Sequence, residues 1–206
     1  KLNTPDFWIK RFKWPSMTDH KYKRGHVLVR SGPTISTGAS RLAAVSALRA
    51  GAGAVTLASG SDSLLVNASH LTSVMLKEIN NADDFFNFVK EKKINTLIIG
   101  PGCGVNQITK ELVIRAIKSE ISFVLDADGL TLFQKNPNEL FDLLNKRRKR
   151  ENIILTPHEG EFNRLFDFGN ISKIDKANRA ANITKSTILF KGNDTIISSP
   201  KKISLI

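Results

Sequence analysis

The sequence contains a single cysteine, Cys103, and no long apolar run. One cysteine excludes an internal disulfide and is typical of a reducing compartment, so we expect a cytoplasmic protein. No stretch approaches the roughly 20 apolar residues that cross a bilayer, which predicts no membrane partner. The first residues also lack the apolar core of a secretory signal. The sequence therefore indicates a soluble, globular protein.

Several common site motifs are also missing. The sequence has no Gly-x-x-x-x-Gly-Lys-Ser/Thr phosphate loop and no Gly-x-Ser-x-Gly of a hydrolase. "GAGAVT" at residues 51–56 lacks a third glycine and precedes a predicted strand, so it is not a dinucleotide-binding fingerprint. The four histidines have no zinc-ligand spacing, and we assign no metal ligands. Cys103 has no visible catalytic partner, which favours a small apolar filler in a tight turn.

Basic residues outnumber acidic ones, 31 to 19, for a net charge of +12. Such a balance fits nucleic acid, an anionic membrane surface, small anionic ligands or a lysine-rich solvated surface, and we favour the last. The densest basic run, residues 146–150, follows an apolar helical stretch, where cations favour a helix end. No zinc-finger, RNP or KH pattern accompanies it, so we predict no nucleic-acid partner.

A chain of 206 residues suits one domain with a sizeable core. Residues 1–24 are irregular and rich in lysine, and we interpret them as an arm laid over a surface. Residues 25–206 are predicted to form one α/β domain. Because the sequence begins with Lys1 and not methionine, we interpret it as a segment of a longer chain.

Strands and helices alternate along this domain, and the strands are apolar on both faces, as in "TLIIG" and "FVLD". This pattern predicts a mostly parallel central sheet with helices on both faces. The last two strands read as a hairpin with a turn at Asn193 and Asp194. The predicted strands are 26–30, 54–59, 73–79, 96–100, 121–126, 152–156, 186–192 and 194–199, and the predicted helices are 39–50, one after residue 61, 81–93, 108–119, 127–135, 137–149, 159–166 and 173–184.

Five of the predicted strands end in glycine, charged or hydroxyl residues. In an open α/β sheet, ligands bind beyond the carboxyl ends of the strands, so these ends are predicted to meet at one crevice. One such end would be weak support, but five along one edge predict a ligand site. The ends are residues 37–39, residues 100–104, Asp126 with Asp128, residues 156–161 and residues 191–195.

Each strand end has a functional and a structural interpretation. The glycines of "GPGCG" let backbone amides approach an anion, or they only form a tight turn. Asp126 and Asp128 suit Mg²⁺ or a hydroxyl, whereas Asp128 also suits a helix cap. His158, stiffened by Pro157, suits a ligand amide or phosphate.

Two further strand-end features stay open in the same way. Glu159 and Glu161 favour the first turn of the next helix, which explains them without any function. Lys191 suits phosphates, and Thr195 starts the second hairpin arm, so that the hairpin can frame a nucleotide.

These segments together resemble one family. "HKYKRGHVLV", "STGASRLAAVSALRAGAGAVTLAS", "LIIGPGCG", "VLDADGL", "LTPHEGEFNRL" and "FKGNDTIISSP" resemble, in order and spacing, the ADP-dependent NAD(P)H-hydrate dehydratases of the ribokinase-like superfamily. In many bacterial repair proteins, such a dehydratase forms the carboxy-terminal domain beside an epimerase. The resemblance covers about residues 20–200. It implies a ribokinase-like fold, homo-oligomers, and a fused or separate NAD(P)H-hydrate epimerase domain.

The resemblance also implies a reaction and its site. The family restores NAD(P)H from its (S)-hydrate, with ADP as phosphoryl donor and Mg²⁺, and releases AMP. By this resemblance, Ala39, Gly102 or Gly104 (the favoured glycine) and His158 contact the hydrated substrate. The adenine nucleotide lies along Lys191, Gly192, Asn193, Asp194 and Thr195.

One motif of the family is missing. Relatives follow the hairpin with a Gly-x-Gly-Asp segment that supplies an anion hole and the catalytic aspartate, and this sequence contains no Gly-x-Gly-Asp. We therefore expect a truncated domain whose catalytic aspartate lies beyond Ile206, and we assign no catalytic residue here. Without that segment, phosphoryl transfer loses its main electrostatic and general-base contributions. The alternatives are an inactive nucleotide-binding remnant and a small-molecule kinase of the same superfamily.

Overall fold

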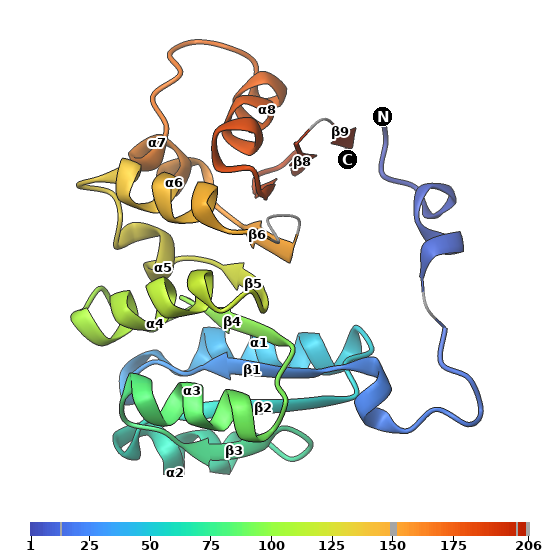
Figure 1. Cartoon of the computed structure of the whole chain (residues 1–206), viewed down its shortest axis with the longest axis vertical. Helices are drawn as coiled ribbons and strands as arrows, with labels where there is room; N and C mark the ends of the chain where they lie inside the picture. Colours follow the sequence, from blue (N-terminus) through green and yellow to red (C-terminus); the bar gives the residue numbers. More distant parts are fainter. Residues whose placement is uncertain (13, 149–151, 201, 205–206) are drawn as a thin grey trace.

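Nine strands of the described residues form one sheet in the order β3-β2-β1-β4-β5-β6-β7-β8-β9 (Figure 1). The computed structural model describes residues 1–12, 14–148, 152–200 and 202–204. Strands β1 to β7 run parallel, and β8 and β9 are antiparallel additions, which confirms the mostly parallel sheet and the hairpin. The strands are β1 (His26–Arg30), β2 (Ala54–Ser59), β3 (Met75–Glu78), β4 (Thr96–Ile99), β5 (Ser122–Leu125), β6 (Ile153–Leu155), β7 (Thr187–Phe190), β8 (Ile196–Ser199) and β9 (Lys202–Ser204).

The helices follow the predicted pattern, and several begin at side-chain caps. Asn81 accepts a hydrogen bond from the Asp84 amide at 2.8 Å. Only the helix predicted at 127–135 is much shorter than expected, because α5 is a single turn. The helices are α1 (Gly38–Arg49), α2 (Ser61–His70), α3 (Ala82–Glu91), α4 (Gln107–Lys118), α5 (Asp128–Thr131), α6 (Pro137–Lys146), α7 (Glu159–Leu165) and α8 (Lys173–Thr184).

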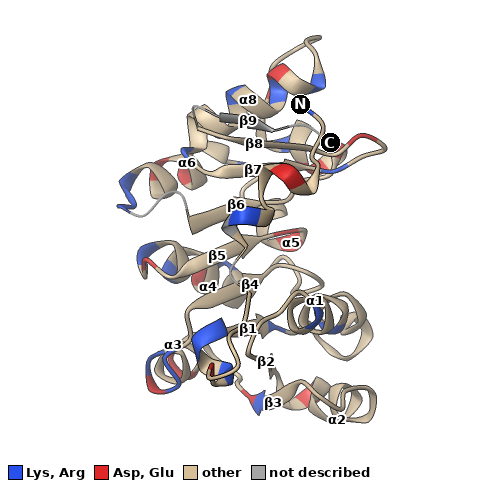
Figure 2. Cartoon of the chain, turned by 90° about the vertical axis from the view of Figure 1, so that its right-hand side faces the viewer, with Lys and Arg blue, Asp and Glu red and all other residues tan. Residues whose placement is uncertain are grey.

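Helices lie on both faces of the sheet, as predicted. Helices α3, α4, α6 and α8 lie along one face, and α1 and α2 lie along the other (Figure 2). In β1, Leu28 packs into the core of the first face, whereas Val27 and Val29 pack into the core of the second. This alternation follows the period of two of a β-strand, which sends successive side chains to opposite faces.

The second face is less completely covered beside β5 to β7. In these strands the residues of one face are buried, while those of the other face are partly exposed. Ile154 of β6 is 36% exposed, although its sequence context is as apolar as that of β2. Coverage on both faces therefore holds for β1 and β2 and only in part for β5 to β7.

The basic run at residues 146–150 is not a uniform solvated surface. Helix α6 ends at Lys146, and the Arg147 side chain is buried. Its guanidinium donates hydrogen bonds to the carbonyl oxygens of Ile117 and Ile121, both at 2.6 Å. Arg147 therefore caps the carboxyl end of α4, where unpaired carbonyls favour a cation. Lys149 and Arg150 lie outside the described residues.

Residues 1–24 contain three short 3₁₀ turns, and none of their described side chains is buried. In Figure 1 this segment runs along the outside of the sheet. Its interpretation as a separate arm stays a prediction. No helix among the described residues is long and apolar enough to cross a membrane.

Candidate functional site

The loops at the carboxyl ends of β1, β4 and β5 touch one another. A Cβ atom on Gly32, after β1, would lie 1.8 Å from the Gly102 carbonyl oxygen, so only glycine fits there. Ser36 donates a hydrogen bond to the same carbonyl at 2.8 Å. On the other side, a Cβ atom on Gly100 would lie 1.8 Å from the Asp126 carbonyl oxygen, and its φ of +126° also requires glycine. Gly32 and Gly100 therefore allow the loops after β1, β4 and β5 to make close backbone contact.

Asp126 joins the ends of β5, β6 and β7. Its Oδ1 accepts hydrogen bonds from the Thr156 hydroxyl and from the Lys191 ammonium, each at 2.7 Å. The Lys191 amide in turn donates to the Pro157 carbonyl oxygen at 2.9 Å. Because it accepts hydrogen bonds from two partners, the Asp126 carboxylate connects the loops after β5, β6 and β7. It also orients the Lys191 side chain.

Asp128 has a different role from the predicted one. The prediction that it caps a helix is wrong, because α5 begins at Asp128 and its cap position is Ala127, which has a φ of +47°. The Asp128 carboxylate instead accepts a hydrogen bond from the Gly104 amide at 2.8 Å. One amide of the glycine loop is thus already paired with an anion of the protein.

A cavity of about 790 Å³ lies between the starts of α7 and α8 and the β7–β8 turn. Its volume is within the range of small-molecule sites, roughly 300 to 1,000 Å³. Three lysines against two carboxylates make its lining positive. The lining residues are His158, Glu159, Ile171, Lys173, Lys176, Phe190, Lys191, Gly192, Asn193 and Asp194.

This cavity brings together only part of the predicted site. His158 lines it beside Lys191, Gly192, Asn193 and Asp194, although these two segments belong to different strand ends. Thr195 does not line it; its hydroxyl donates to the Gly192 carbonyl oxygen at 3.3 Å and so stabilises the turn. Ala39, Gly102 and Gly104 do not line it either. Ala39 is exposed in the first turn of α1, and the two glycines lie in the loop after β4.

His158 is the N-cap of α7. Its Nδ1 accepts a hydrogen bond from the Glu161 amide at 3.2 Å, and the Glu161 carboxylate accepts one from the His158 amide at 2.9 Å. This reciprocal pair is a capping box. A neutral imidazole that accepts at Nδ1 carries its proton on Nε2, and the side chain is 52% exposed. Its Nε2 lies 3.4 Å from Glu161 Oε1, so His158 combines a structural role at the start of α7 with a place in the cavity lining.

Lys173 stabilises the β7–β8 turn and was not among the residues predicted from the sequence. Its ammonium lies 2.8 Å from Asp194 Oδ1, hydrogen-bonds the Asp194 carbonyl oxygen, and lies 4.9 Å from the centre of the Phe190 ring. The hydrogen bond from Lys173 lowers the pKa of the Asp194 carboxyl below its ordinary value. In the sequence, one sign of such a role is that Lys173 begins a predicted helix, where a cation is electrostatically unfavourable.

The described residues do not form a protein-only metal site. No group of three or more histidine, cysteine or acidic side chains is placed to hold an ion in the part of the chain that the structure describes. Asp126 and Asp128 already accept hydrogen bonds from protein groups. Mg²⁺ commonly binds through one or two carboxylates together with phosphates and water.

Cys103 is buried, as predicted for a filler. Burial raises the pKa of its thiol to about 11, so the reactive thiolate is scarce at neutral pH. This observation agrees with the absence of a nucleophilic role.

Comparison with known proteins identifies the family of this chain. A family model described as NAD(P)H-hydrate dehydratase matches residues 27–206. The chain belongs to the NAD(P)H-hydrate dehydratase family. It is 35% identical over 146 residues to the bifunctional NAD(P)H-hydrate repair enzyme of Coxiella burnetii, a match that covers 71% of this chain and 28% of that protein. It spans 35% and 38% of the length of two further bacterial repair enzymes, so the chain is about a third of such proteins.

The family's fold is also seen in solved structures. A ribokinase-like superfamily protein of Enterococcus faecalis superposes with a TM-score of 0.75 at 18% identity, over 90% of this chain and 64% of that one. The ADP/ATP-dependent NAD(P)H-hydrate dehydratase of Bacillus subtilis, co-crystallised with ATP and Mg²⁺, superposes with a TM-score of 0.71 at 22% identity, over 93% and 66%. The ribokinase-like fold predicted for this family member is therefore confirmed.

Proposed function

We propose that this chain binds an adenine nucleotide and an (S)-NAD(P)H hydrate and serves in the ADP-dependent dehydration that restores NAD(P)H. The observation that carries the proposal is the cavity shared by His158 and residues 191–194, which come from the two family motifs "LTPHEGEFNRL" and "FKGNDTIISSP". Membership of the NAD(P)H-hydrate dehydratase family supports the choice of substrate.

The proposed reaction has two parts. The terminal phosphoryl group of ADP moves to the hydroxyl oxygen of the hydrate, whose proton passes to a base. Phosphate then leaves with the electrons of the carbon–oxygen bond, and the neighbouring carbon loses a proton to form the double bond. The products are AMP, phosphate and NAD(P)H. Most of the protein's contribution to such a transfer is positioning and charge stabilisation.

The chain supplies the positioning groups on the nucleotide side. Lys173, Lys176 and Lys191 line a common cavity, and a negatively charged polyphosphate complements their charge. Lys191 is held by Asp126 yet remains 38% exposed, so its charge is both oriented and accessible. Mg²⁺ would join these residues mainly through the phosphates.

We propose substrate contacts for the start of α1, for the loop after β4 and for His158. Ala39 and the glycine loop, with Gly102 and Gly104, would receive the hydrated nicotinamide nucleotide, and the proton on His158 Nε2 would meet its polar groups. The sequence has no Gly-x-Gly-Asp, so we assign the general base to none of these residues and expect it in a segment outside them.

Titration of the purified chain with ADP, followed by calorimetry, tests the binding half of the proposal. We expect Lys191→Met to weaken ADP binding about tenfold, because it removes a charge-assisted contact to phosphate. Lys135→Met, at an exposed position outside the cavity, is the matched control and should leave the affinity unchanged. Failure of the unaltered chain to bind ADP, ATP or AMP at millimolar concentrations would refute the proposed site.

Incubation with NAD(P)H hydrate and ADP, followed through the absorbance of the reduced nicotinamide, tests the chemistry. We expect nucleotide binding without turnover by these 206 residues, and turnover when the Gly-x-Gly-Asp segment of a family member is joined to them. Turnover by the 206 residues alone would show that our assignment of the base is wrong. A comparison of ADP with ATP in the joined protein identifies the donor.

We also propose that the protein is cytoplasmic, forms homo-oligomers, and works with an NAD(P)H-hydrate epimerase domain. The name of the C. burnetii relative, a bifunctional repair enzyme more than three times as long as the matched part, supports the last point. Sedimentation of the purified chain, alone and with an epimerase, tests both associations.

A further inference from the structure

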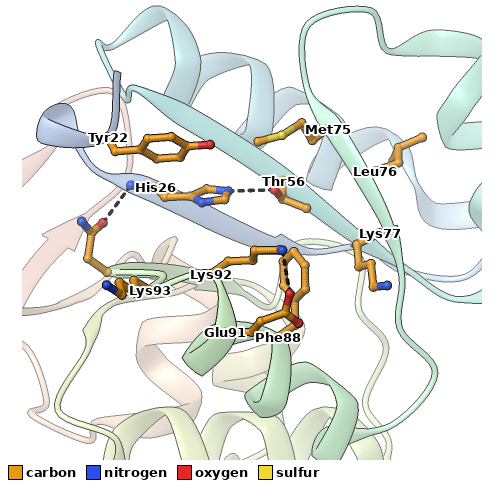
Figure 3. Close-up of a pocket in the computed structure, with 11 residues that line it drawn as sticks. Tyr22, His26, Thr56, Met75, Leu76, Lys77, Phe88, Glu91, Lys92 and Lys93 are labelled. Atoms are coloured by element: carbon orange, nitrogen blue, oxygen red, sulfur yellow. Dashed lines mark hydrogen bonds and ion pairs between the residues drawn. The ribbon is translucent and has the colours of Figure 1, made fainter. Parts of the chain in front are cut away.

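A second cavity of about 620 Å³ opens at the opposite, amino ends of the strands (Figure 3). His26 is the first residue of β1, Met75 is the first residue of β3, and Lys92, Lys93 and Asn95 lie between α3 and the start of β4. The candidate functional site lies beyond the last residues of β6 and β7. The two cavities share no lining residue, so the second one is not explained by the proposed dehydration. Its lining is completed by Tyr22, Thr56, Leu76, Lys77, Phe88 and Glu91.

His26 is a buried polar side chain with one unused hydrogen-bonding atom. The residue is 5% exposed, and its Nε2 lies 2.8 Å from the Thr56 hydroxyl oxygen. Its Nδ1 is buried and has no hydrogen-bond partner among the described residues. Burial lowers the pKa of His26, which keeps the imidazole neutral near pH 7. Most buried polar atoms in proteins are paired, and an unpaired Nδ1 on a residue that lines the cavity leaves one hydrogen bond for a bound molecule to make.

The walls of the cavity are aromatic and apolar. Tyr22 and Met75 lie on one side of the opening and Phe88 on the other, with His26 and Thr56 between them in Figure 3. Flat aromatic rings stack on such side chains, and a methionine thioether adds favourable contact with them. A lining of this kind, apolar with few polar groups, is typical of small-molecule sites.

The rim of the cavity is cationic. Lys92 is paired with Glu91 at 2.6 Å. Lys77 and Lys93 form no ion pair with any described residue, although the Lys77 ammonium lies 6.0 Å from the centre of the Phe88 ring. Three lysines against one carboxylate line this apolar cavity, and this balance favours a ligand that carries negative charge.

We propose that this cavity is a second ligand site, for a flat aromatic ring that carries a carboxylate or a phosphate group. The ring lies between Tyr22 and Phe88, and its anionic group faces Lys77 and Lys93. A polar atom of the ring or of its substituent meets His26 Nδ1. The site is separate from the sheet edge at which the proposed phosphoryl transfer takes place.

2-Naphthoate, with 2-naphthamide as its uncharged analogue, provides the test. In ¹⁵N-labelled protein we expect 2-naphthoate to shift the backbone amide signals of residues 75–77 and 88–93 and to leave those of residues 191–194 unchanged. We expect the amide to bind about tenfold more weakly, since it lacks the charge that faces the lysines. AMP, as a second arm, distinguishes a phosphate-bearing ligand from a carboxylate-bearing one by its effect on the same signals.

Two charge reversals on neighbouring elements complete the test. Lys77→Glu should weaken 2-naphthoate binding about tenfold or more, because it replaces attraction by repulsion at the rim. Lys90→Glu, an exposed residue of α3 that does not line the cavity, should change the affinity less than about twofold, since an exposed charge that does not contact the ligand is screened by water and salt. The proposal is overturned if neither 2-naphthoate nor AMP moves the signals of residues 75–77 and 88–93. It is equally overturned if the two reversals weaken binding alike, or if the acid and the amide bind equally.

Discussion

The two halves of the sheet differ in how they are covered. Every residue of β2 is buried, and so are the first four residues of β1. In β5, β6 and β7, buried residues alternate with partly exposed ones. Yet Asp126, His158 and Lys191, the charged and polar groups of the candidate site, all follow strands of this less covered half. The covered half thus provides most of the two-sided core, and the other half provides the groups of the candidate functional site.

The difference has a physical reason. Charged side chains lose favourable hydration when they are buried, so a site that uses them is favoured beside strands that are only partly covered. Figure 2 shows acidic and basic residues mainly on the outer helices and loops, while strands β4 and β5 are uncharged along their length. At the strand ends the charges are instead held by partners, such as Asp126 by Lys191. Stability and nucleotide binding at the candidate functional site are therefore expected to depend on different halves.

Truncation of one apolar residue in each half tests this separation, with the largest expected effect. Leu28→Ala, at a fully buried position of β1, should lower the free energy of unfolding by about 3 kcal/mol, because it removes packed atoms and leaves a cavity. Ile154→Ala, at a position 36% exposed in β6, should cost less than about 1.5 kcal/mol, because less surface is removed from contact. Urea denaturation measures both. Equal losses would mean that the two halves are equally packed.

Two substitutions of His158 separate its roles in the less covered half, with an intermediate effect. His158→Ala removes the cap acceptor of α7 and should cost about 1 kcal/mol. His158→Asn keeps an acceptor suited to a helix cap and should restore most of that loss. Both variants lose the imidazole donor, so both should bind the hydrated nucleotide more weakly. If His158→Asn binds it normally, the cap is the residue's only role.

The smallest effect concerns pH and the covered half. Burial lowers the pKa of His26 below its ordinary value of 6.5, so below pH 6.5 the unfolded chain binds more protons than the folded one. The contribution of His26 to stability is therefore complete above pH 6.5 and is lost progressively as the pH falls below that value. His26→Gln should flatten this dependence in urea denaturation between pH 5 and 7.5. An unchanged slope would show that other groups cause it.

Much of the fold could be predicted because it rests on local patterns. The strand predicted at residues 54–59 agrees with β2 at both ends, since the strand preference of a short apolar run depends on residues close in sequence. The coverage of each strand could not be predicted, because "IIL" in β6 has the same composition whether or not a helix packs over it. The predicted cap role of Asp128 failed for a related reason: its partner, Gly104, is 24 positions away.

The sequence by itself determined the alternating α/β order, the polar strand ends and, through its motifs, the family. These features depend on residue type and short-range spacing. Only the tertiary structure decided that Lys191 pairs with Asp126, that Arg147 is buried against α4, and that Lys173 holds the turn at Asp194. It also decided that His26 and Phe88 line one cavity at the amino ends of the strands. Each of these contacts joins residues far apart in the chain, and only packing of the whole sheet brings such groups together.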